Sequence, residues 1–360
     1  MKTIIIGTSK FGNPISNYYK SLGECFQKHN YRVVYIFDGL FNDYPEENEN
    51  LKFYTWKNKR PTKIADFLFF WKILKKEKPV LCISNFGSTN IMTIASYFFK
   101  VKNRVNYVHT TSKSLILETS KNAFIYKFFK IRKQLVYNLN THLFANSNGT
   151  KQDTIDHYHI PAKKITILPL LIKSSSVEYA SFQQREKSIC IVGRFHPTKG
   201  HREFLFLFQK CLDKYPDIKL KLVGDGYLKQ ELVELTKTLK IENNVIFTGK
   251  IPNEEVGKMF STSLISISSS VFEAYGLVNI EALREGTPLI CTRTAGSSDI
   301  IDEEVNGLFF NLDDNLSLLS AIEKILENWD YFSKNALNSF KQKYSTESIE
   351  NHFNIVKNFT

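Results

Sequence analysis

Residues 188–208 read SICIVGRFHPTKGHREFLFLF, and this stretch decides the fold expected for the chain. The apolar run 188–192 predicts a buried β-strand, a glycine-bounded loop follows it, and the pattern of 199–214 predicts a helix. A strand followed by a loop and a helix is the repeating unit of a parallel α/β sheet. The stretch therefore predicts a parallel sheet with crossover helices.

The same alternation extends in both directions along the chain. In the second half we expect strands at 218–223, 244–248, 264–268 and 288–291, and helices at 227–239, 275–285 and 315–327. In the first half we expect strands at 3–7, 32–37, 80–84, 105–108, 141–145 and 164–168, and a helix at 14–29 that Asn13 can cap.

A polar stretch with weak periodicity separates the two halves. At about 100 to 200 residues per domain, 360 residues suggest two domains. We place the first at 1–172, a linker at 173–187 and the second at 188–340. The fold class is therefore α/β, with two Rossmann-like, doubly wound parallel sheets. We expect them to face each other across a cleft at the carboxyl ends of their strands, where such sheets bind ligands.

Composition excludes several other classes of protein. A hydrophobic content of 42% argues against disorder, and no apolar run approaches the roughly 20 residues that a membrane span needs. The apolar run at the N-terminus is too short for a signal peptide. Five scattered cysteines without a CxxC spacing indicate neither a disulfide framework nor a zinc site, so we expect a cytoplasmic protein.

The net charge of +12 belongs to one half of the chain. Residues 1–180 hold 27 Lys and Arg against 12 Asp and Glu, whereas residues 181–360 hold 21 against 24. Within the first half, residues 51–150 alone hold 18 basic and 3 acidic residues. This excess favours an anionic partner such as a phospholipid surface, a phosphorylated substrate or a nucleic acid.

Two segments of the second half carry candidate chemistry. In the loop 193–200, Arg194 and Lys199 suit a diphosphate, although both can equally be solvated side chains. In 272–288, Gly276 opens a helix whose positive end favours an anion, and Glu281 lies about 7.5 Å farther along. That distance fits ribose hydroxyls, and Glu273 would face the group beyond the phosphates. Taken alone, both glutamates can also be surface charges.

Together these motifs resemble the retaining family 4 glycosyltransferases, the glycosyl transferases group 1, of the GT-B fold. The resemblance rests on the GRF…KG loop at 193–200, the Gly-Asp-Gly at 224–226, the segment 248–251, the pair Glu273 and Glu281, and the Gly-Thr-Pro at 286–288. It also implies that the tail 341–360 forms a helix that crosses back onto the first domain.

The resemblance implies a role for each matched residue. Arg194 and Lys199 would bind the donor diphosphate, and Glu281 would bind the ribose. Glu273 would hold hydroxyls of the donor sugar, so that Glu273, Arg194, Lys199 and His109 form the catalytic set. Backbone groups would complete the donor site, those of Gly276, Leu277 and Val278 at the diphosphate and those of Lys250 and Ile251 at the base.

The first domain matches the family more weakly. Gly12 stands where two glycines are common, in a turn near the phosphate and the acceptor. His109 follows the strand 105–108, where relatives often place a histidine near the donor sugar, but a structural histidine is an equally good interpretation.

The implied activity is retaining sugar transfer from a nucleoside-diphosphate sugar, with uridine diphosphate as the commonest carrier. The acceptor would be a saccharide or a lipid-linked molecule, as in surface polysaccharide or glycolipid synthesis. Neither a cofactor nor a metal ion is expected, because no Asp-x-Asp pair is present and Arg194, Lys199 and a helix end supply positive charge.

Aromatic and basic residues alternate in 121–137 and again in 64–78, which suggests peripheral contact with an anionic membrane. The alternative is that Phe124, Phe128, Ile131 and Leu135 pack on the sheet.

Two other functions remain open at this point. A non-hydrolysing epimerase would act on a sugar nucleotide without an acceptor. A basic nucleic-acid-binding protein is disfavoured, because no RRM, KH, helix-turn-helix or zinc pattern occurs.

Overall fold

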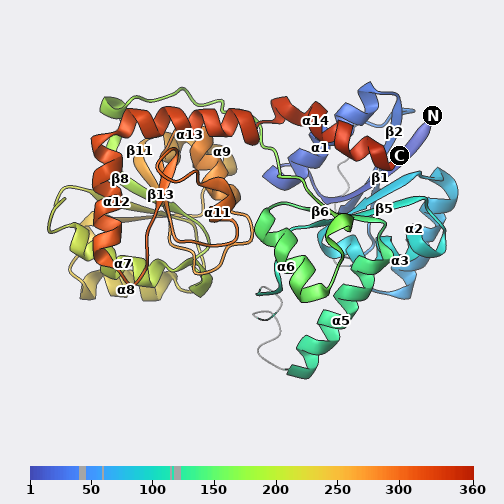
Figure 1. Ribbon diagram of the computed structural model, residues 1–360, viewed down its shortest axis with the longest axis horizontal. Coiled ribbons are helices and arrows are strands. Elements are labelled where there is room, and N and C mark those ends of the chain that lie inside the picture. The colour runs from blue at the N-terminus through green and yellow to red at the C-terminus, as the bar shows by residue number, and fades with distance from the viewer. Residues whose placement is uncertain (40–45, 59–60, 114–115, 117–122) are drawn as a thin grey trace. The chain divides into compact units, whose positions relative to one another are not determined.

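The computed structural model describes residues 1–360 except 40–45, 59–60, 114–115 and 117–122, and it divides into two compact units (Figure 1). Unit 1 comprises 1–172 together with 346–360, and unit 2 comprises 173–345. The stretch 173–187, expected as a linker, is part of unit 2. Arg185 anchors it there, since the buried guanidinium donates to the carbonyls of Ser263 at 2.8 Å and Glu285 at 2.8 Å.

Unit 1 is a seven-stranded parallel sheet in the order β3-β2-β1-β4-β5-β6-β7. The strands are β1 Lys2–Ser9, β2 Tyr31–Asp38, β3 Leu51–Thr55, β4 Leu81–Ser84, β5 Asn103–Val108, β6 His142–Ala145 and β7 Ile165–Ile167. The helices are α1 Pro14–Lys28, α2 Ile64–Glu77, α3 Thr89–Phe98, α5 Ala123–Leu139 and α6 Asn148–Tyr158, with α14 Ile349–Val356 from the far end of the chain.

Unit 2 is a six-stranded parallel sheet in the order β10-β9-β8-β11-β12-β13. The strands are β8 Glu186–Val192, β9 Lys219–Val223, β10 Val245–Gly249, β11 Ser263–Ser268, β12 Leu289–Cys291 and β13 Gly307–Phe309. The helices are α7 His201–Cys211, α8 Lys229–Thr238, α9 Asn253–Ser261, α10 Leu277–Arg284, α11 Ser297–Ile300, α12 Asn315–Glu327 and α13 Trp329–Lys343.

Central strands are buried on both faces, which explains their unbroken apolar sequences. Ile4, Ile5 and Ile6 of β1 are fully buried, as is Ile189 of β8. The helix expected after Asn13 forms as anticipated, because the Asn13 side chain accepts from the Ser16 amide and Pro14 occupies the first turn. The two doubly wound parallel sheets are thus as the sequence predicts.

Two strands were not expected from the sequence. β3 is an edge strand with Lys52 as its second residue, and β13 is an edge strand of three residues. Short or half-exposed edge strands lack the continuous apolar run that marks a central strand.

The chain ends in unit 1 through α14. His352 Nδ1 lies 3.0 Å from the hydroxyl of Tyr18 in α1, and the Phe353 ring packs edge-on against Phe26 at 4.9 Å. The Thr346 amide donates to the carbonyl of Ile172 at 3.0 Å, so the change of unit falls between 345 and 346 rather than at 341.

Candidate functional site

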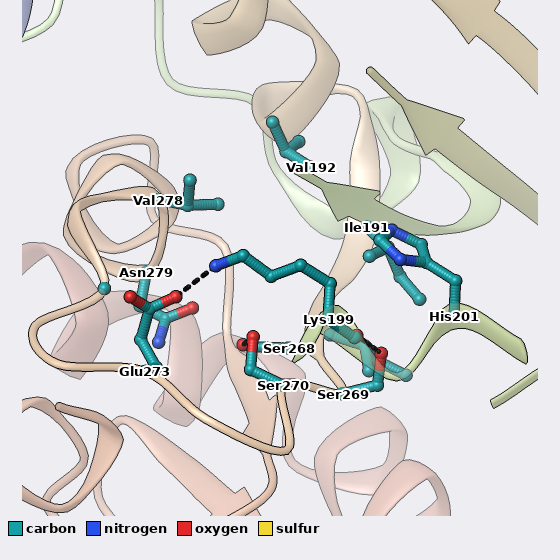
Figure 2. Close-up of a pocket in the computed structure, with 12 residues that line it drawn as sticks. Ile191, Val192, Lys199, His201, Ser268, Ser269, Ser270, Glu273, Val278 and Asn279 are labelled. Carbon is teal, nitrogen blue, oxygen red and sulfur yellow. Dashed lines mark hydrogen bonds and ion pairs between the residues drawn. The ribbon is translucent and has the colours of Figure 1, made fainter. Parts of the chain in front are cut away.

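A pocket in unit 2 lies where the strand order reverses, between β8 and β11 (Figure 2). In an open parallel sheet the carboxyl ends of the two strands at this reversal diverge and leave room for a ligand. The pocket is lined by Ile191, Val192, Lys199, His201, Ile267, Ser268, Ser269, Ser270, Glu273, Gly276, Val278 and Asn279.

Two hydrogen bonds to backbone carbonyls join the two loops that carry the charged residues of this pocket. The Val271 amide donates to the carbonyl of Thr198 at 3.0 Å, and the Ser269 hydroxyl donates to the carbonyl of Lys199 at 2.8 Å. Gly200 has φ +62°, and a Cβ there would lie 2.1 Å from the Ser269 carbonyl oxygen. Only glycine therefore permits this close approach, which holds the Lys199 backbone against the end of β11.

The two loops also meet through an ion pair. Lys199 Nζ donates to the Glu273 carboxylate, and the two side chains are 25% and 21% exposed (Figure 2). This half-buried pair lies at the pocket, which Ser268, Ser269 and Ser270 also line. The structure thus brings together one cation and one carboxylate that the sequence singled out.

The helix α10 begins at this pocket. Gly276 caps its N-terminus in the left-handed conformation, with φ +88°. A Cβ on Gly276 would lie 3.0 Å from Asn279 Nδ2 and 3.4 Å from Glu273 Cγ. The first-turn amides of Leu277 and Val278 and the positive end of the helix dipole favour an anion.

Two polar residues of the pocket were missed by the sequence reasoning. Both ring nitrogens of His201 and Nδ2 of Asn279 are buried without a hydrogen-bond partner among the described residues. Burial, together with the charge of Lys199, lowers the pKa of His201 to about 4, so this ring is neutral at pH 7. Only their positions in the sequence could have identified them. His201 directly follows Gly200 of the loop 193–200, and Asn279 lies in the first turn of α10.

The other expected donor residues do not line this pocket. Arg194 is exposed after β8, Lys250 and Ile251 follow β10, and Leu277 is the first residue of α10. Glu281 lies one turn farther along α10. Burial raises its pKa to about 7, an effect that Arg284 opposes and Glu285 strengthens.

His109 and Gly12 belong to unit 1. The His109 ring is stacked between Phe86 at 4.4 Å and Tyr107 at 4.8 Å, and its Nε2 lies 3.3 Å from the Tyr19 hydroxyl. Burial lowers the pKa of His109 to about 3. Gly12 has φ +124°, and its amide donates to Asn17 Oδ1 at 3.1 Å, which shapes the turn before α1.

One cluster with ligand chemistry lies elsewhere in unit 1. Cys25, His29 and Glu350 each offer one donor atom, and these atoms lie within 4.8 Å of one another. The cluster joins α1 to α14 and shares no residue with the pocket of unit 2.

Comparison with known proteins gives the context of this geometry. Residues 177–343 match the model of glycosyl transferases group 1, and residues 15–174 match that of glycosyltransferase family 4. An uncharacterised glycosyltransferase of Methanocaldococcus jannaschii is 29% identical over 46% of this chain and 43% of its own length.

A second relative, from Campylobacter jejuni, is N-acetylgalactosamine-N,N'-diacetylbacillosaminyl-diphospho-undecaprenol 4-alpha-N-acetylgalactosaminyltransferase. It is 25% identical over 66% of this chain and 65% of its own length. Both matches thus span less than two thirds of the relatives.

Among solved structures, Anabaena HepE in complex with UDP superimposes with a TM-score of 0.77, covering 100% of both chains at 15% identity. At that identity the likeness concerns the fold alone. The two doubly wound sheets and the two family matches, which together span most of the sequence, lead to one conclusion: the chain belongs to the group 1, family 4 glycosyltransferases and has the GT-B fold.

Proposed function

We propose that this protein transfers a sugar, with retention of configuration, from a uridine diphosphate sugar to a saccharide or lipid-linked acceptor. The carrying observation is the convergence of Lys199, Glu273 and the Gly276 end of α10 on one pocket at the strand reversal of unit 2. We place the reaction in the cytoplasm, in surface polysaccharide or glycolipid synthesis, with the enzyme at the inner face of the membrane.

The donor diphosphate would displace the Glu273 carboxylate from the Lys199 ammonium group. The leaving diphosphate gains negative charge as the glycosidic bond breaks, and a cation and a helix end that already face it stabilise that charge. Arg194 would close over the outer phosphate from its exposed loop. Glu273, released from Lys199, would accept hydrogen bonds from sugar hydroxyls.

The base and the ribose would lie along the edge of the sheet. Backbone groups at Lys250 and Ile251 would contact the base, and Glu281 would accept hydrogen bonds from the ribose. Leu277 and Val278 would present their amides to the diphosphate. We propose that no metal ion takes part, because Lys199, Arg194 and the helix end provide the positive charge that a divalent cation supplies elsewhere.

His109 and Gly12 of unit 1 would act on the sugar and the acceptor. A histidine whose pKa is about 3 stays neutral at pH 7, so His109 would donate or accept a hydrogen bond rather than exchange a proton. A lipid-linked acceptor finds support in the Campylobacter relative, whose name contains diphospho-undecaprenol.

The experiment is a panel of sugar nucleotides screened by thermal shift, followed by turnover with and without an acceptor. A ligand at 100 times its dissociation constant adds about 2.7 kcal/mol to the free energy of unfolding. We expect stabilisation by uridine nucleotides, unchanged activity in EDTA, and a product with the anomeric configuration of the donor. Conversion of the sugar nucleotide without an acceptor would instead identify an epimerase.

A further inference from the structure

The helix α5 presents an apolar stripe to solvent. Phe124, Phe128, Ile131 and Leu135 are spaced by four, three and four residues, which places them on one face of the helix. Their exposed fractions are 82%, 59%, 47% and 60%. The interpretation in which these four residues pack on the sheet is therefore wrong.

The opposite face of α5 attaches the helix to unit 1. Val136 and Tyr137 are its buried residues, and the Tyr126 hydroxyl lies 2.7 Å from His157 Nε2 of α6. Lys133 Nζ lies 5.2 Å from the Tyr158 ring centroid on the same side. The helix is thus held by one face, and its apolar stripe is the face that points away.

Positive charge flanks this stripe. Lys127 and Arg132 lie on either side of it in the helical projection, Lys130 lies farther round, and α5 contains no acidic residue. The surrounding segment 51–150 has 18 basic and 3 acidic residues. An exposed apolar stripe between cations complements the headgroups and acyl chains of an anionic bilayer.

The second aromatic and basic segment does not repeat this arrangement. In α2, Phe70 is buried and Phe67 and Phe69 pack against the apolar core of unit 1. The prediction that 64–78 forms a matching membrane surface is therefore not supported by these aromatic residues, and α5 alone carries the argument.

We infer that α5 lies in the interface of an anionic phospholipid membrane, with Phe128, Ile131 and Leu135 among the acyl chains and Lys127, Lys130 and Arg132 at the phosphates. No helix among the described residues is long and apolar enough to span a bilayer, so α5 rests on the surface. This inference does not depend on the proposed catalytic activity, since lipid binding is measured without substrate.

The direct test uses two variants of the full chain, in each of which one residue is replaced by tryptophan. Phe128→Trp places the reporter on the stripe, and Leu316→Trp places it on α12 of unit 2, at a site that is 75% exposed. With phosphatidylglycerol vesicles we expect a blue shift of the Phe128→Trp emission and its quenching by brominated acyl chains. The Leu316→Trp signal should not change. A Phe128→Trp signal that vesicles leave unchanged would overturn the inference.

Vesicle flotation of substituted variants measures how much each group of side chains contributes to lipid binding. Replacing Lys127, Lys130 and Arg132 together by Gln should weaken partition by about 100-fold, since each cation near the surface contributes about fivefold. Replacing Phe128, Ile131 and Leu135 together by Ser should weaken it at least tenfold, whereas Leu316→Ser should leave it unchanged. Unchanged melting temperatures of the variants would show that they fold.

Other occupants of the stripe give different results. Equal partition of the native protein into neutral phosphatidylcholine vesicles would contradict the role of the cations. A native protein that sediments as a dimer without lipid, and becomes a monomer when the stripe is replaced by Ser, would assign the stripe to a second copy of the chain and refute the membrane assignment.

Discussion

Lys199 and Glu273 lie 74 positions apart in the sequence, yet their side chains form an ion pair across the pocket of unit 2. The pair joins the loop after β8 to the loop after β11, the two strands between which the order of the sheet reverses. In the proposed reaction these side chains separate, because the ammonium group turns to phosphate and the carboxylate to the sugar. Without a ligand, each of the two side chains therefore neutralises the charge that the other would present to the donor.

Replacing Lys199 by Ala should lower kcat/KM at least tenfold, about 1.4 kcal/mol in transition-state stabilisation, because the leaving diphosphate loses a fixed cation. Steady-state kinetics with the preferred donor measure this loss. Lys229→Ala in α8 is the control, since Lys229 also pairs with a carboxylate, that of Asp225, but at a more exposed position and outside the pocket. Equal kinetics of the Lys199 variant and the native protein would refute the assignment.

Replacing Glu273 by Gln should separate binding from transfer. In the Glu273→Gln variant Lys199 has no ion pair that UDP must break. The affinity for UDP should therefore equal or exceed that of the native protein. Turnover should fall at least tenfold, because the sugar hydroxyls lose a charged hydrogen-bond acceptor. Calorimetry with UDP and kinetics with the sugar donor measure the two effects. A parallel loss of UDP affinity and turnover would contradict this division of roles.

Gly276→Ala should lower the free energy of UDP binding by more than it lowers the free energy of unfolding. A left-handed alanine costs roughly 1 to 2 kcal/mol, and its Cβ would also press on Asn279 Nδ2 at 3.0 Å. Gly39→Ala in unit 1 is the control, because Gly39 has φ +101° and nothing lies within 4 Å of its Cβ position. Both variants should lose stability in thermal melts, but only the Gly276 variant should lose binding in excess of that loss.

Glu281 should make stability depend on pH between about 4.5 and 7. Burial raises the pKa of the folded carboxyl to about 7, whereas the unfolded chain keeps the ordinary value near 4.5. As the pH rises through this window the unfolded state ionises first, so the free energy of unfolding falls, by about 1.4 kcal/mol per unit of pKa difference at most. Glu281→Gln should flatten this slope in urea titrations from pH 4.5 to 8. A slope that the substitution leaves unchanged would contradict the shifted pKa.

His109 should stay neutral throughout the physiological range. The stacked rings of Phe86 and Tyr107 remove water from the imidazole, and burial lowers its pKa to about 3. Nitrogen NMR of histidine-labelled protein should show no titration of this ring between pH 5 and 9. A midpoint for His109 near 6.5 would reopen a role in proton transfer.

The sequence predicts the central part of each sheet well, because a strand buried on both faces must be apolar throughout. Ile4 to Ile6 and Ile189 to Ile191 show this rule. It fails at two of the edge strands, since Lys52 interrupts β3 and β13 has only three residues. A pattern of apolar residues is a weak guide where one side of a strand faces water.

The site was predictable only in part, for a different reason. Spacing identified Lys199, Glu273 and Gly276, because glycine and charge stand out at the ends of strands. It did not identify His201 and Asn279, because whether their polar atoms lack partners depends on packing across the sheet. The orientation of α5 also escaped prediction, since Phe124 and Phe129 are equally apolar and only the docked helix shows which one faces out.

The segment 346–360 completes unit 1 by packing α14 against α1. During synthesis, the sheet of unit 1 emerges from the ribosome long before the helix that covers Tyr18 and Phe26. The helix α1 therefore stays partly uncovered until residues 346–360 have been made. A stop codon at position 346 would consequently damage a unit whose sheet was made long before that position was reached.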